Sequence, residues 1–83
     1  MFKLEIKTSE KIFLVTMNEL TSVKDSLPLD YVLELKRNIR SINPTHYNIV
    51  VDSRNLNTKQ YHVVGEMMKM IHEVPFNHIK VLL

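Results

Sequence analysis

The sequence contains no cysteine, no alanine and a single glycine among its 83 residues. Without cysteine, a disulfide framework, a thiolate metal site and a cysteine nucleophile are all excluded, and a reducing compartment fits. The absence of alanine, together with eight lysines against three arginines, is the pattern that AT-rich codons produce. We infer an origin in a low-GC bacterium or a phage of one.

The sequence also lacks long apolar runs and long runs of one charge. No stretch approaches the roughly 18 apolar residues of a membrane helix, and the N-terminal residues lack the apolar core of a signal peptide. The net charge of +2 arises from 11 basic and 9 acidic residues spread along the chain. We therefore expect a cytoplasmic protein that binds neither membrane nor nucleic acid.

The composition is that of one folded domain spanning residues 1–83. Hydrophobic residues make up 45% of the chain and charged residues 24%, which is ordinary for a globular protein. A chain this short buries only about 60 to 65% of its unfolded surface, so a partner would add to a marginal stability.

Four segments have the pattern of β-strands. Residues 2–7 alternate apolar and charged side chains, which predicts a half-buried edge strand, whereas residues 11–17 are apolar on both faces and predict an inner strand. The short connection between these two favours an antiparallel hairpin. Residues 47–52 and 78–83 predict two further strands.

Two segments have the pattern of amphipathic helices, at residues 30–42 and 58–74. In each, apolar residues recur at spacings of 3, 4 and 3, which places them on one helical face: Val32, Leu35, Ile39, Ile42 and Val64, Met67, Ile71, Val74. The methionines at 67, 68 and 70 are interpreted as core residues or, alternatively, as an adaptable binding surface.

The predicted order β-β-α-β-α-β indicates an α/β fold with a four-stranded mixed sheet. Right-handed crossovers between the parallel strands put both helices on the same face of that sheet. The other face then keeps apolar side chains of the inner strands, so we expect a homo-oligomer or another protein partner to cover them.

The candidate site lies after the third strand, beside the start of the second helix. Its residues are Asp52, Ser53, Arg54, Asn57, Thr58 and Lys59. Ligands of open α/β sheets bind beyond the carboxyl ends of parallel strands, where the basic side chains could neutralise a phosphate. The alternative interpretation is that these residues make turns and a helix cap, since no glycine-rich loop accompanies them.

No pattern of catalytic or metal-binding residues stands out. The four histidines are scattered, and His62 with Glu66, one helical turn apart, has no third ligand at suitable spacing except Glu73. Neither a nucleophile elbow nor a paired-carboxylate motif occurs. We expect a protein that is not an enzyme and has no metal and no cofactor.

Residues 47–83, "YNIVVDSRNLNTKQYHVVGEMMKMIHEVPFNHIKVLL", resemble the second half of STAS-like domains, the fold of anti-sigma-factor antagonists. In that family a hydrophobic strand ending in Asp leads through a short loop to a helix with a phosphorylatable Ser or Thr. Thr58 stands where the phosphoacceptor would be, but the Ser and Gly that follow it in the family signature are absent. The resemblance implies a small intracellular regulator or adaptor. The alternative is a self-assembling structural or assembly subunit, for example one derived from a phage.

Overall fold

The computed structural model describes residues 2–18, 29–56 and 61–83, and these form a mixed α/β fold. The elements follow in the order β1 (Phe2–Lys7), β2 (Ile12–Asn18), α1 (Leu29–Arg40), the short 3-10 helix η1 (Pro44–His46), β3 (Asn48–Asn55), α2 (Tyr61–His72) and β4 (His78–Leu82). The predicted order β-β-α-β-α-β is therefore confirmed, as is the α/β class.

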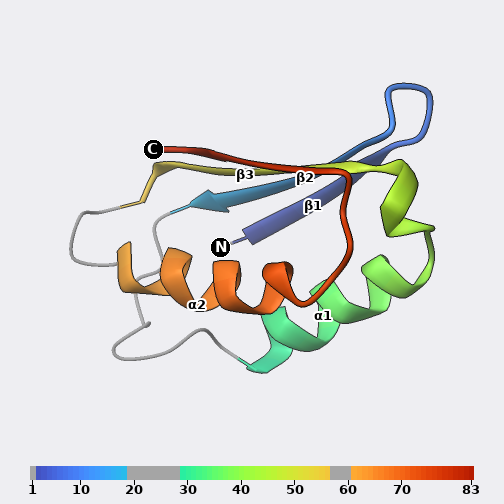
Figure 1. The fold of residues 1–83 in the computed structure, drawn as a ribbon. Coiled ribbons are helices and arrows are strands. Elements are labelled where there is room, and N and C mark those ends of the chain that lie inside the picture. The colour runs from blue at the N-terminus through green and yellow to red at the C-terminus, as the bar shows by residue number, and fades with distance from the viewer. Residues whose placement is uncertain (1, 19–28, 57–60) are drawn as a thin grey trace.

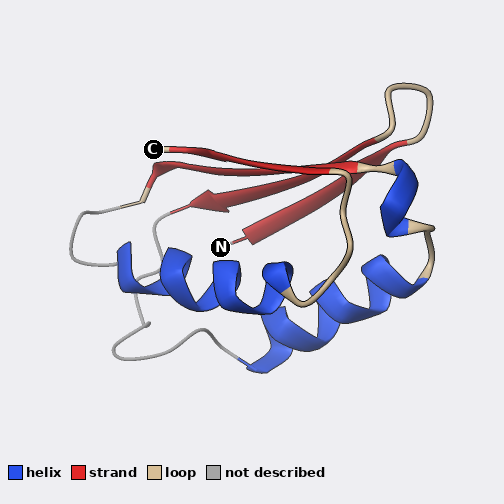
Figure 2. Ribbon diagram, in the orientation of Figure 1, coloured by secondary structure: helices blue, strands red, loops and turns tan. Residues whose placement is uncertain are grey.

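The strands lie in the sheet in the order β1-β2-β3-β4, the same as their order along the chain. β1 is antiparallel to β2, whereas β2, β3 and β4 are parallel to one another. Figure 1 shows α1 and α2 side by side below the sheet, and Figure 2 shows the same two layers. Both helices cover one face, as predicted.

The turn between β1 and β2 places Lys11 in the left-handed region, with φ of 57°. A residue with a side chain rarely adopts this backbone conformation, so its neighbours must hold it there. The carbonyl of Lys11 accepts a hydrogen bond from the backbone N–H of Asn48 (2.9 Å), and its ammonium lies 5.4 Å from the centre of the Tyr47 ring. The hairpin is thereby joined to the start of β3.

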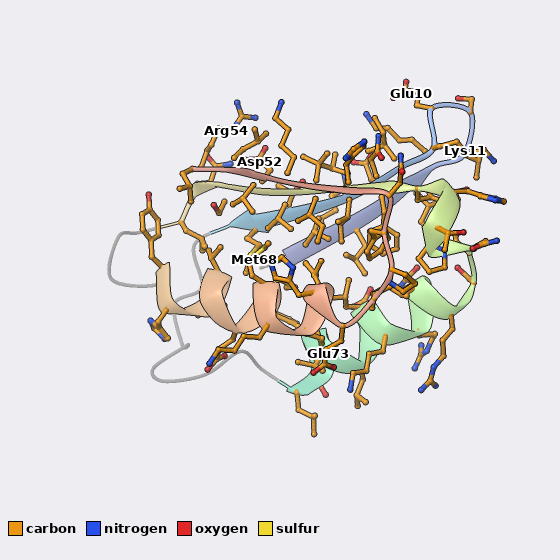
Figure 3. All side chains as sticks on the ribbon, viewed as in Figure 1. Glu10, Lys11, Asp52, Arg54, Met68 and Glu73 are labelled. Carbon is orange, nitrogen blue, oxygen red and sulfur yellow. The ribbon has the colours of Figure 1, made fainter. Side chains whose placement is uncertain are left out.

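The core lies between the sheet and the helices. Alternate residues of the two inner strands point toward the helices and are fully buried, as are the inward residues of α1 and α2: Phe13, Val15, Met17, Ile49, Val51, Leu35, Val63, Met67 and Ile71. Met67 belongs to this core, and Met68 and Met70 pack against it while partly buried. Figure 3 shows Met68 between α2 and the sheet. The interpretation of the methionines as core residues is therefore the better one.

The element boundaries differ from the predicted ones mainly at β3. We predicted that the third strand ends at residue 52 and a loop follows, but β3 continues to Asn55. The described part of α2 begins at Tyr61, and α1 ends at Arg40 rather than at residue 42. The extension of β3 changes the surroundings of the predicted site.

A first prediction concerns Gly65, which is exposed in the middle of α2. A methyl group added there would have no atom within 4 Å. Glycine costs a helix interior about 0.5 to 1 kcal/mol relative to alanine. Gly65→Ala should therefore raise the free energy of unfolding by about that amount in a denaturant titration. An unchanged or lowered stability would mean that α2 is not a regular helix at this position.

Candidate functional site

Asp52, Ser53 and Arg54, three of the six predicted site residues, are consecutive residues of β3 rather than parts of a loop. Alternation along the strand therefore sends Asp52 and Arg54 to one face of the sheet and Ser53 to the other. Figure 3 shows Asp52 and Arg54 on the side away from the helices. The other three, Asn57, Thr58 and Lys59, lie outside the described residues, as does the proposed cap of the second helix.

Asp52 and Arg54 form a bidentate ion pair. The Nε and Nη2 atoms of Arg54 donate to Oδ1 and Oδ2 of Asp52 at 2.9 and 2.8 Å. The backbone N–H of Arg54 donates to the same Oδ1 at 3.2 Å. The Asp52 side chain is 15% exposed and that of Arg54 is 62% exposed, so water screens the pair mainly on the arginine side.

This pairing favours the charged forms of both side chains, so it lowers the pKa of Asp52 and raises the pKa of Arg54. The hydrogen bonds from the Arg54 side chain are the main cause of a lowered pKa for Asp52, and burial opposes them only in part. The same hydrogen bonds raise the pKa of Arg54. Asp52 is therefore held as a carboxylate and is poorly suited to act as a general acid.

Ser53 is fully buried on the helix side of the sheet. Its hydroxyl donates a hydrogen bond of 2.7 Å to the backbone carbonyl of Leu82, near the end of β4. This bond crosses between two parallel strands whose residues are 29 positions apart in sequence. This hydrogen bond thus links β3 to β4 near the carboxyl ends of both strands.

These contacts leave little of residues 52–54, the described part of the predicted site, for a bound phosphate. The guanidinium of Arg54 already binds a carboxylate through two donors, and the hydroxyl of Ser53 is buried and engaged. A phosphate would have to displace Asp52 to reach Arg54. Among residues 52–54, the structure thus favours structural pairing over an anion site.

The grooves on the helix side are small. One of about 220 Å³ lies between α1 and α2, and another of about 280 Å³ lies along α1. Binding pockets for small molecules usually measure about 300 to 1,000 Å³. Their lining residues are Leu33, Lys36, Arg37, Ile39, Arg40, Met70, Glu73 and Val74. Both grooves therefore fall below the usual range for a small-molecule site.

Within the described ranges, no three histidine, aspartate or glutamate side chains lie together in a way that could hold a metal ion. His62 and Glu66 lie on α2 without a third ligand among the described residues. Neither of the two described α-helices has the length and apolar character needed to cross a membrane.

Neither described α-helix lies over the face of the sheet away from the helices, which is called the open face below (Figure 2). The strand register arranges it in three rows that run from β1 to β4. The rows are Lys7, Ile12, Asn48, His78; then Glu5, Leu14, Val50, Lys80; then Lys3, Thr16, Asp52, Leu82. Apolar side chains lie on the inner strands and charged ones mostly on the two edge strands.

The apolar side chains at the centre of the open face are partly buried. Ile12, Leu14 and Val50 each keep an intermediate fraction of their surface in contact with water. These are the apolar side chains that the sequence predicts on the face of the inner strands that the helices do not cover.

Comparison with known proteins finds no matching family model and no significant match among curated proteins or solved structures.

The pairing of the two charged edges in common rows was not recognised from the sequence alone. Alternation in residues 2–7 puts Lys3, Glu5 and Lys7 on one face, but only the register shows which residues of β4 share a row with them. The Asp52–Arg54 pair did have a sequence signal. Opposite charges two residues apart lie on the same face once the segment is assigned to a strand.

A second prediction concerns the pH dependence of the ion pair. In Arg54→Gln the pKa of Asp52 should rise toward its ordinary value of 3.8, as measured by NMR titration of the carboxyl carbon. Because folding lowers this pKa, the stabilisation is fully present above the unfolded-state value and is lost as pH falls through the folded-state value. The stability difference between wild type and Arg54→Gln should therefore be largest near neutral pH and shrink below about pH 4.

The matched control is Arg37→Gln, which removes an exposed arginine from α1. This variant should leave the titration of Asp52 unchanged. A stability difference for Arg54→Gln that is the same at pH 7 and pH 2 would contradict the proposed linkage.

A third prediction concerns Ser53. Ser53→Ala should lower the free energy of unfolding by about 1 kcal/mol, because it removes the hydrogen bond to the Leu82 carbonyl. Amide hydrogen exchange in β4 should quicken more than in β1. Ser41→Ala, which removes an exposed hydroxyl bonded to the Asn38 carbonyl, is the control and should change stability by less than about 0.5 kcal/mol. Equal losses in the two variants would show that burial of Ser53 has no special role.

Proposed function

We propose that this chain is a non-enzymatic protein-interaction module whose binding surface is the open face of the sheet. The observation that carries the proposal is the placement of both helices on one face. The other face keeps Ile12, Leu14 and Val50 in partial contact with water. Apolar side chains at the centre of a surface with charged edges are the usual anatomy of an interface.

Burial of the apolar side chains alone is too weak to hold a partner, so the partner must also form ion pairs with the charged side chains of the open face. Full burial of an aliphatic side chain is worth about 1.5 to 3 kcal/mol, and these three are already half-buried. Since about a third or less of each remains exposed, covering all three would contribute only about 1.5 to 3 kcal/mol, which is less than the roughly 4 to 15 kcal/mol that association costs. Specific binding then depends on the charged side chains around them.

The described side chains also support a role without catalysis. The carboxylate of Asp52 is held by Arg54, and the hydroxyl of Ser53 is buried and hydrogen-bonded. The grooves beside α1 are too small for most substrates. These groups contribute to the sheet rather than to a reaction centre.

A second candidate is a regulator of the kind that residues 47–83 resemble. In that case the partner would bind the start of α2 and the segment before it. The observation that favours this surface is Tyr61, whose side chain is 39% exposed at the first position of α2. Tyrosine is enriched at protein interfaces because its ring is large and has a polar tip.

Site-specific photo-crosslinking distinguishes these two surfaces. A photoreactive phenylalanine analogue is placed at Leu14, at Tyr61 or, as a control, at the exposed Glu10 in the β1–β2 turn (Figure 3). In cells that naturally make the protein, the open-face proposal predicts a discrete adduct from position 14 and none from position 10. An adduct from position 61 alone would favour the regulator, and no adduct from position 14 or 61 would count against both.

A further inference from the structure

The central row of the open face has an order of charges that is complementary to itself. From β1 to β4 it reads acidic, apolar, apolar, basic, with Glu5, Leu14, Val50 and Lys80. A two-fold rotation about an axis parallel to the strands, in the plane between two stacked sheets, reverses the order of the strands and keeps the rows aligned. The rotated row then reads basic, apolar, apolar, acidic.

We propose that the open face binds a second copy of this chain, in a dimer whose two-fold axis runs parallel to the strands. The proposal rests on the function proposed above, since it names the partner of the same surface. Such an interface is isologous, so every contact between different residues occurs twice.

The symmetry pairs each charged end of the central row with its opposite. Glu5 of each copy lies over Lys80 of the other, and Leu14 of each copy lies over Val50 of the other. Packed sheets lie about 10 Å apart and cross at about 30°, which displaces the ends of the rows by a few ångströms. The long side chains of glutamate and lysine can span such a displacement.

The two outer rows place no lysine over another lysine and no carboxylate over another carboxylate in this arrangement. Lys7 of one copy meets the imidazole of His78 of the other. Lys3 meets Leu82, along whose apolar surface the lysine stem can lie. The central row therefore supplies the attraction, and the outer rows are compatible with it.

The other way of stacking two such faces is disfavoured by charge. A two-fold axis across the strands would place each strand over its own copy. Glu5 would then face Glu5 and Lys80 would face Lys80, and like charges across an interface cost several kcal/mol. The order of charges thus selects the axis parallel to the strands.

The size of the face indicates a weak dimer. Four strands about 4.8 Å apart, over about five residues of about 3.3 Å each, give roughly 300 Å² per copy. The total of roughly 600 Å² is about half of the smallest standard interface. A dissociation constant between about 10 µM and 1 mM is therefore expected.

A charge-swap experiment tests the proposal on the whole chain. Sedimentation equilibrium at pH 7.5, from about 20 µM to above 1 mM, should show a reversible monomer–dimer equilibrium for the wild type. Glu5→Lys and Lys80→Glu should each raise the dissociation constant at least about tenfold, because each places like charges together twice. The double variant restores opposite charges and should return to within about threefold of wild type.

The controls are Glu34→Lys on α1 and Lys69→Glu on α2, which make the same charge changes on the exposed side of the helices. They should leave the dissociation constant within about twofold of wild type. Both open-face single variants are needed. Glu5 also contacts Lys3 of its own strand at 3.2 Å, whereas Lys80 forms no ion pair with a described residue of its own chain.

Three results would overturn the dimer: a wild type that stays monomeric throughout the concentration range, single variants that dimerise like wild type, or a double variant as weak as the singles. If the purified protein is monomeric and position 14 still crosslinks to a different protein, the dimer fails and the interaction module stands. If position 14 forms no adduct as well, both proposals fail.

Discussion

The architecture depends on the direction in which the chain crosses the sheet. Two successive crossovers between parallel strands, from β2 to β3 and from β3 to β4, advance the same way along the sheet. Connections of the same hand that advance in the same direction must lie on the same face. Both helices therefore share one layer, the core forms on that side, and the opposite face is left to the strands alone. The open face is therefore a consequence of the strand order and of the hand of the crossovers.

Much of the fold was predictable because its apolar residues follow two clear periods. Spacings of 3 and 4 marked both helices, and alternation or continuous apolar runs marked all four strands. The error at β3 has a physical cause. Asp52 and Ser53 are residues that usually make turns, yet here the ion pair with Arg54 and the hydrogen bond to Leu82 satisfy their polar groups within the sheet. Tertiary contacts overrode local preference.

The sequence predicted the site only in part, because the role of each side chain depends on which face of the sheet it occupies and on its neighbours in adjacent strands. Sequence placed Asp52, Ser53 and Arg54 beside each other, but it did not show that the strand divides them between two faces. Nor did it show that Glu5 and Lys80, which are 75 residues apart in the numbering, end the same row. Register is set by pairing across strands, so a pattern along one strand cannot specify its neighbours in the next.

The agreement between strand order and chain order bears on how the protein is made. Each strand of the sheet pairs with the strand that precedes it in sequence, so no strand must be inserted between two that are already paired. During synthesis the β1–β2 hairpin offers β2 as a template for β3, and β3 in turn offers a template for β4. A sheet with this order can grow at one edge as the ribosome releases it, and each of its two parallel steps closes a crossover of more than 20 residues that contains a helix. The last strand is the one whose pairing waits longest, and the hydrogen bond from Ser53 to the Leu82 carbonyl can form only when that strand pairs.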